Sequence, residues 1–230
     1  MSRFMFTVLL MLSGAAHALP VDLSHARYSV STYAEVDADS DGIHAFDSPP
    51  AALPVFSHAA IVGADIDVDE FANADAIAED GLLGVSSEAQ GSLHHAGAVA
   101  EVSLEQSLGI AGAYVLTLDF ESLLDLAGAD GGTSLTLAVS IGAQTLFDEI
   151  FTDTQIITRR FALAPGEQGL LHVGLVSSMD GFGDGGADTL YGFSLASVDV
   201  RLNAVPSPNA LSLMVAGLLP LWRRRRVSLR

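Results

Sequence analysis

Apolar side chains recur at every second position along the second half of the chain, in short segments that end at glycine or polar residues. These segments cover residues 100–104, 114–120, 135–141, 145–151, 156–163, 171–176 and 191–202. A period of two is typical of strands with one buried and one solvated face. Short strands, glycine-rich turns and no sustained helical period predict an all-β fold, an antiparallel β-sandwich of jelly-roll type.

The alternation is weaker near the N-terminus, in a region rich in Ala, Asp, Ser and Pro. We expect short strands at Ala26–Val36 and Ala59–Val68, and a short helix at Phe71–Leu83. The difference in alternation divides the chain between its two end segments into two regions. Residues 19–95 form an acidic N-terminal region with short strands, and residues 96–204 form the β-sandwich core.

Residues 1–18 have the pattern of a signal peptide. Arg3 provides the positive start, Phe4–Leu12 is an apolar run, and Ala16 and Ala18 occupy the small-x-small positions. The apolar run is shorter than the roughly 20 residues that a membrane-spanning helix needs. We therefore expect signal peptidase to cleave after Ala18 rather than leave a retained anchor.

Residues 205–230 combine a proline motif, an apolar stretch at Ala210–Trp222 that contains Gly217, and a basic end. The motif and the basic end consist of Val205, Pro206, Ser207 and Pro208, and of Arg223, Arg224, Arg225 and Arg226. The apolar stretch predicts a short transmembrane helix whose arginines stay on the cytoplasmic side. Its length of about 20 Å is less than the roughly 30 Å of a hydrocarbon core.

This order of motif, apolar helix and arginine cluster resembles the PEP-CTERM sorting tail. The resemblance covers about the last 26 residues, although Ser207 stands where the family usually has glutamate and Pro220 lies within the apolar segment. It implies export in a Gram-negative bacterium and recognition by an exosortase, a membrane enzyme that removes such tails. It also implies passage through the inner membrane to the outer surface or the extracellular matrix, in bacteria that often make exopolysaccharide.

A second, broader resemblance concerns the region before the tail. A final strand at residues 197–202 that runs straight into the proline motif is similar to the globular part of many PEP-CTERM proteins. Those domains resemble carbohydrate-binding sandwiches. The implied partner is a polysaccharide.

Charge is concentrated between the two ends. All 28 acidic residues lie in residues 19–204, where only Arg27, Arg159, Arg160 and Arg201 oppose them, so the net charge of this part is −24. Such a surface makes nucleic acid and anionic lipid poor partners and attracts divalent cations, so we expect no nucleic acid among the partners. The chain has no cysteine, which excludes disulfides, thiolate metal sites and cysteine nucleophiles.

Calcium is the expected ion at two acidic segments. Asp37, Asp39 and Asp41, followed by glycine, match the opening of an EF-hand-like loop, but Ser48 stands where the closing carboxylate belongs. An ordinary acidic turn is the alternative. The second segment lies between two expected strands and resembles one turn of the Gly/Asp nonapeptide of calcium-binding β-helices, with a plain Asp/Gly loop as the alternative. Its acidic residues are Asp180, Asp184 and Asp188.

Other chemistry is weakly indicated. Asp65, Asp67 and Asp69 would share one face of a strand. A solvated outer face is a simpler interpretation of these three carboxylates than a cation site. No nucleophile elbow, phosphate loop or HExxH sequence occurs, and His94 and His95 are adjacent and would point to opposite faces. Four aromatic residues are candidates for a sugar-stacking platform: Tyr114, Tyr191, Phe182 and Phe193.

We therefore expect a non-catalytic exported surface or extracellular-matrix protein that is sorted through its C-terminal tail and associates with exopolysaccharide, with calcium as an accessory ion. Two alternatives stay open. One is a secreted hydrolase that acts on polysaccharide through paired carboxylates. The other is a cell–cell adhesin.

The tail assignment predicts a change in location. Deletion of residues 205–230 removes the sorting motif, so the protein should no longer follow membrane-dependent sorting. Fractionation of cells that express the truncated and intact chains measures this. Unchanged localisation of the truncated chain would contradict the assignment.

Overall fold

The computed structural model describes residues 18–37, 43–50, 53–62, 70–91, 95–182 and 190–206, and these contain thirteen strands and no helix. Every pairing between these strands is antiparallel, which confirms the all-β prediction. The strands are β1 (Leu19–Pro20), β2 (Arg27–Asp37), β3 (Ile43–Asp47), β4 (Val55–Val62), β5 (Phe71–Glu79), β6 (Leu82–Gly91), β7 (His95–Leu108), β8 (Gly112–Ala127), β9 (Asp130–Ile141), β10 (Gln144–Phe151), β11 (Gln155–Leu163), β12 (Gly169–Phe182) and β13 (Leu190–Pro206).

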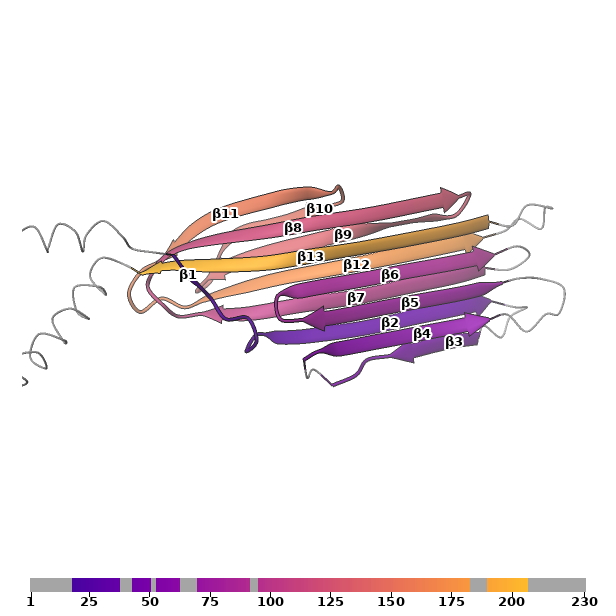
Figure 1. Ribbon diagram of the computed structural model, residues 1–230, viewed down its shortest axis with the longest axis horizontal. Helices are drawn as coiled ribbons and strands as arrows, with labels where there is room; N and C mark the ends of the chain where they lie inside the picture. Colours follow the sequence, from indigo (N-terminus) through magenta and orange to yellow (C-terminus); the bar gives the residue numbers. More distant parts are fainter. Residues whose placement is uncertain are drawn as a thin grey trace, which may run out of the picture.

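The strands form two sheets that lie over one another in a sandwich-like arrangement (Figure 1). The seven-stranded sheet has the order β11-β8-β13-β6-β5-β4, with β1 added at the end of β13. The six-stranded sheet has the order β10-β9-β12-β7-β2-β3. The short strands β10 and β11, one in each sheet, therefore form one long edge of the domain, and β3 and β4 form the other.

The division at residue 95 does not separate two structural units. Strands β6 and β7, on either side of it, lie in facing sheets and contact one another. The N-terminal strands β2 and β3 extend the sheet beside β7, while β4 and β5 extend the other sheet beside β6. Residues 19–95 and 96–204 thus share one hydrophobic core.

The helix expected at Phe71–Leu83 is wrong, because this segment forms β5 and the start of β6. Alanine favours helices, but here four alanines alternate with larger or polar residues, and they are buried at Ala72, Ala74, Ala76 and Ala78. A period of two matches a strand and not a helix. The small alanine side chains let β5 pack closely against the facing β2 and β7.

The core consists of the inward residues of both sheets. Phe120, Leu118 and Leu137 are fully buried, and they come from β8 and β9. Buried hydroxyls also link the two sheets, as when Ser87 of β6 donates a 2.9 Å hydrogen bond to the backbone oxygen of Ser177 in β12. Because Ser57, Ser87 and Ser177 each have a hydrogen-bond partner, these polar residues are accommodated at little cost.

Tyr28 anchors the N-terminal segment against the seven-stranded sheet. Its buried hydroxyl donates to the Leu23 backbone oxygen and accepts from the Gly81 amide, both at 3.0 Å. Burial raises the pKa of Tyr28. Gly81 has φ +76°, and a Cβ there would lie 2.9 Å from the Val200 oxygen, so the turn between β5 and β6 requires glycine.

Both predicted end segments lie mostly outside the described residues. Of the signal-cleavage pair, Ala18 directly precedes β1, while Ala16 lies outside. Of the sorting motif, Val205 and Pro206 complete β13, opposite Ala113 and Gly112 of β8. The other motif residues fall outside the described residues: Ser207, Pro208, Gly217, Arg223, Arg224, Arg225 and Arg226. Among the residues that can be described, no helix has the length and hydropathy needed to cross a membrane.

The Tyr28 contacts predict a loss of stability on removal of one oxygen atom. Tyr28→Phe leaves the buried Gly81 amide without its partner and removes one of the two hydrogen bonds to the Leu23 carbonyl, which still accepts from the Ala26 amide at 2.9 Å. The substitution should lower the free energy of unfolding by about 1–3 kcal/mol. Urea denaturation of residues 19–206 measures this. The control is Tyr114→Phe, which removes a single bond, to the Ile110 oxygen, and should cost about 1 kcal/mol. Equal losses would contradict the anchoring role of Tyr28.

Candidate functional site

The acidic segments singled out in the sequence all adjoin one end of the domain. Asp37 is the last residue of β2 and lies opposite His95 of β7, which in turn lies opposite Phe182, the last residue of β12. The strand ends of β4 and β12 that precede the other acidic segments lie at this same end (Figure 1). The remaining acidic residues fall outside the described residues: Asp39, Asp41, Asp65, Asp67, Asp69, Asp184 and Asp188.

Asp180 belongs to a cluster on the outer face of the six-stranded sheet, which we name the Glu35 cluster: Tyr33, Glu35, His95 and Asp180. The His95 ring lies between two carboxylates, with Nε2 3.0 Å from Asp180 and Nδ1 3.5 Å from Glu35. The Tyr33 hydroxyl donates to Glu35, and this bond raises the pKa of Tyr33. Gly97 leaves room for the ring, because a Cβ there would lie 3.1 Å from His95 Cε1.

A shallow hollow of about 280 Å³ borders the Glu35 cluster. Asp130 of β9 lies directly opposite Asp180 and adds a further carboxylate to its lining. The His95 ring lies between the Glu35 and Asp180 carboxylates, so these groups do not converge on one point that an ion could occupy. Within the described residues, no group of three or more His, Asp and Glu could hold a metal ion. Calcium binding by the acidic segments remains a prediction.

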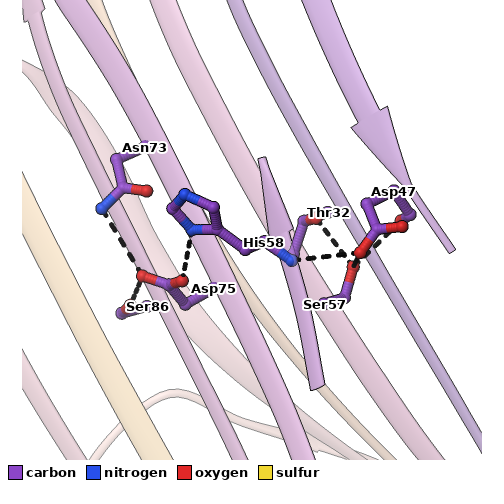
Figure 2. Close-up of polar contacts among 7 residues, drawn as sticks. All are labelled: Thr32, Asp47, Ser57, His58, Asn73, Asp75 and Ser86. Carbon is purple, nitrogen blue, oxygen red and sulfur yellow. Dashed lines mark hydrogen bonds and ion pairs between the residues drawn. The ribbon is translucent and has the colours of Figure 1, made fainter. Parts of the chain in front are cut away.

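A second cluster lies on the outer face of the seven-stranded sheet, and we name it the Asp75 cluster: His58, Asn73, Asp75 and Ser86. Figure 2 shows these side chains around the Asp75 carboxylate. His58 Nδ1 is 2.7 Å from one Asp75 oxygen, and the second oxygen accepts from Ser86 at 3.4 Å and from Asn73 Nδ2 at 3.5 Å. The residues come from the adjacent strands β4, β5 and β6, where the register sets His58, Asp75 and Ser86 in one row.

An exposed aromatic ring adjoins the Asp75 cluster. Phe56, two residues before His58 on β4, is 57% exposed, and its ring stacks on the His58 ring with centroids 6.4 Å apart. The Oδ1 atom of Asn73 is buried and has no hydrogen-bond partner within the described part of the chain. The surface therefore combines one free apolar ring with carboxylate, amide, imidazole and hydroxyl groups.

Hydrogen bonds to Thr32 and Asp47 hold β4 in place beside these side chains (Figure 2). Ser57, whose side chain points inward, shares a 2.8 Å hydrogen bond with Thr32 of the facing sheet and donates to Asp47 Oδ2 at 3.1 Å. Asp47 Oδ2 also accepts from the His58 backbone amide at 3.2 Å. Since strand residues alternate in direction, fixing Ser57 inward fixes Phe56 and His58 outward.

The structure separates the four aromatic candidates of the sequence. Tyr114 is buried and stacks on Phe161, so it belongs to the core. Tyr191 and Phe193 are half-buried on the outer face of β13, and Phe193 lies opposite Glu88. The fourth candidate, Phe182, ends β12. Tyr114, Tyr191 and Phe193 are less exposed than Phe56. The sequence did not indicate Phe56, because the inward positions of its strand include Ser57 and Ala59, and the apolar alternation is therefore weak.

Tyr191 has the most perturbed acid–base behaviour of these residues. A 2.7 Å hydrogen bond to Glu88 raises the pKa of Tyr191 to about 12, with smaller contributions from burial and from the nearby Glu88 and Asp125 charges. The neutral hydroxyl is the form that can donate to Glu88. The bond between β13 and β6 is therefore maintained throughout the neutral pH range.

No family model matches the chain, and no curated protein matches it. Several solved chains show slight similarity, among them two from infectious bursal disease virus. The structure of infectious bursal disease virus Gt strain is 11% identical, with 93% of this chain and 73% of that chain covered and a TM-score of 0.17. The infectious bursal disease virus VP2 subviral particle is also 11% identical, with 92% and 75% covered and a TM-score of 0.15. Similarity at this level carries no argument about function.

The Tyr191 pKa predicts a pH dependence of stability. Because the folded-state pKa is raised above the ordinary value of about 10, the contribution is complete below pH 10 and is lost as the pH rises through about 12. Subtracting the ultraviolet pH titration of Tyr191→Phe from that of the parent chain should show the Tyr191 hydroxyl ionising near pH 12. In a Glu88→Gln background, the same difference should show a Tyr191 pKa closer to the ordinary value of about 10. An unchanged titration would contradict the assigned cause.

Proposed function

We propose that this chain is a non-catalytic exported protein of the cell surface or extracellular matrix, and that it associates with exopolysaccharide through the Asp75 cluster and Phe56. The signal-peptide pattern and the resemblance of residues 205–230 to a sorting tail support export, with signal peptidase and exosortase as processing partners. The same patterns support passage through the inner membrane to the outer surface of a Gram-negative bacterium.

We also propose that the domain is a β-sandwich of jelly-roll type. The strand order supports this, because β6-β13-β8-β11 in one sheet faces β7-β12-β9-β10 in the other. Eight strands that cross repeatedly between two four-stranded sheets are the pattern of a jelly roll. The strands β2, β3, β4 and β5 then extend both sheets, and β4 and β5 carry the proposed glycan site.

The observation that carries the proposed function is the pairing of an exposed ring with a fixed carboxylate. The CH face of a pyranose packs on an aromatic ring such as Phe56. Asp75 is oriented by His58, and carboxylate, amide and hydroxyl groups beside it match the donors and acceptors of sugar hydroxyls. An apolar platform flanked by a few fixed polar groups is the arrangement that small sugar sites require.

The charge of the protein indicates the class of glycan. Residues 19–204 carry a net charge of −24, so an acidic polysaccharide would be repelled unless cations intervene. A neutral polysaccharide meets no such repulsion. We therefore propose a neutral glycan as the direct ligand, with calcium required only for an acidic one.

The geometry gives less support to the hydrolase alternative. A glycosidase needs two carboxylates that converge on one bond within a cleft. Asp75 lies on an open sheet face, and its oxygens are engaged by His58, Ser86 and Asn73. Asp130 and Asp180 lie side by side on the other sheet, where the Asp180 side chain is 58% exposed. The adhesin alternative differs from the proposed function only in the partner.

The proposed function predicts binding in a glycan-array assay on residues 19–206, run with calcium and with chelator. This piece contains all thirteen described strands, including β13 to its end at Pro206. Neutral glycans should bind under both conditions. Phe56→Ala should weaken binding by about 1–2 kcal/mol, roughly tenfold, because the stacking face is lost.

The matched control is Phe46→Ala, which removes a ring that is 67% exposed on β3 of the other sheet. This variant should bind as the parent does. Asp75→Asn keeps the shape of the side chain but loses the charge-assisted bond to His58, and should also weaken binding. Absence of binding to any glycan, with or without calcium, would contradict the proposed function and favour a protein partner.

A further inference from the structure

Strand β8 extends well beyond the edge strand that covers it. The pairing of β11 with β8 ends where Gln155 lies opposite Phe120, but β8 continues to Ala127. On its other side, β8 stays paired with β13 as far as Leu126. Within the described residues, no strand lies against the outer edge of β8 after Phe120.

The edge strand of the facing sheet is also shorter than its neighbour. Strand β10 pairs with β9 only as far as Leu135, which leaves the earlier residues of β9 without a neighbour on that side. Figure 1 shows the turn that joins β10 to β11 lying part-way along β8 and β9. At this corner of the domain neither sheet has a further strand among the described residues, and we name the uncovered segments the β8 notch: the free edge of residues 123–127 of β8 and residues 130–134 of β9.

The direction of the backbone groups in the notch follows from Ser122. The Ser122 amide donates to Thr154 Oγ1 at 2.9 Å, and Thr154 Oγ1 donates back to the Ser122 oxygen at 3.2 Å. The Ser122 peptide groups thus point away from β13. Because strand residues alternate, the amide and carbonyl groups of Leu124 and Leu126 point the same way, into the notch.

The notch is also apolar. Leu123, Leu124 and Leu126 are 57%, 46% and 42% exposed, and they lie on both faces of the same short segment. Leu123 lies opposite Leu195 of β13, which is 43% exposed, so the apolar surface continues across the sheet. A free strand edge bordered by exposed leucines is a template for the addition of another strand.

We propose that the β8 notch binds a short extended segment of a partner protein, which adds to the sheet in line with β11 and carries a basic residue opposite Asp125. Strand addition supplies hydrogen bonds to Leu124 and Leu126, and alternate side chains supply specificity. The exposed charges on the receiving segment are Glu121 and Asp125, both acidic, which favours a basic partner. This inference is independent of the proposed glycan site, which lies on β4, β5 and β6.

A second copy of the chain fits the notch less well. If two β8 edges paired antiparallel through Leu124 and Leu126, Asp125 of one copy would face Asp125 of the other. Like charges directly opposite one another across a strand pair are destabilising. The large negative charge of the domain adds to this repulsion. The partner segment therefore differs from β8 in charge.

The test uses the full-length chain in nonionic detergent and the capped peptide Thr-Val-Lys-Val-Leu, whose lysine would lie opposite Asp125. Fluorescence anisotropy of the labelled peptide measures binding at low ionic strength. Replacing the lysine by glutamate should weaken binding about fivefold, because an attractive cross-strand pair becomes a repulsive one. N-methylation of both valines removes the amide hydrogens that donate to the Leu124 and Leu126 carbonyls and puts methyl groups at the pairing edge, so it should abolish binding.

A charge exchange separates specific docking from general attraction. Asp125→Lys should reverse the preference, so that the glutamate peptide binds better than the lysine peptide. The control, Asp148→Lys, changes the same charge on β10 outside the notch and should leave the preference unchanged. Binding that ignores N-methylation, or an equal response of the two variants, would overturn the proposal. Self-association of the chain in sedimentation velocity that is lost in Leu124→Asp would also overturn it, since the occupant would then be a second copy.

Discussion

The structure depends on the burial of alternate side chains between two facing sheets. One side of each long strand contributes to a single core, from Ala34 and Val36 in β2 to Leu202 in β13. Burial at about 25 cal/mol per Å² of apolar surface is the main favourable term in such a fold. Because the alternation is strict, every residue directed inward fixes its two neighbours outward. The outer faces, and the sites on them, are consequences of the packing between the sheets.

The candidate sites illustrate this dependence. Thr32 and Ser57 share a buried hydrogen bond between the sheets, and this contact sets the orientation of β4. Phe56 and His58 then stand on the outer face as direct neighbours of Ser57 in sequence. The register of β4, β5 and β6 places His58 and Ser86, from the two neighbouring strands, on either side of Asp75. On the opposite sheet, the absence of a side chain at Gly97 lets the His95 ring lie between Glu35 and Asp180.

Unequal strand lengths have a different effect. In the core of the domain each strand has neighbours on both sides, so that its backbone groups are paired. The short strands β10 and β11 cover only part of β9 and β8, and the uncovered corner has free backbone groups beside exposed leucines. At the opposite edge, the Asp47 side chain accepts a hydrogen bond from the His58 amide of the edge strand β4. Side chains thus occupy single backbone groups at both edges, Thr154 at Ser122 and Asp47 at His58.

Sequence alone determined the fold class and most strands after residue 96, since an apolar period of two in segments such as 114–120 and 135–141 has only one common structural interpretation. It was wrong at Phe71–Leu83, where alanine's local preference for helix opposed a period of two, and packing between the sheets decided the outcome. It also determined which residues carry charge, but not which of them meet. His58 and Asp75, or Glu35, His95 and Asp180, come together only through strand register and sheet order, which are set by long-range pairing that no local pattern contains.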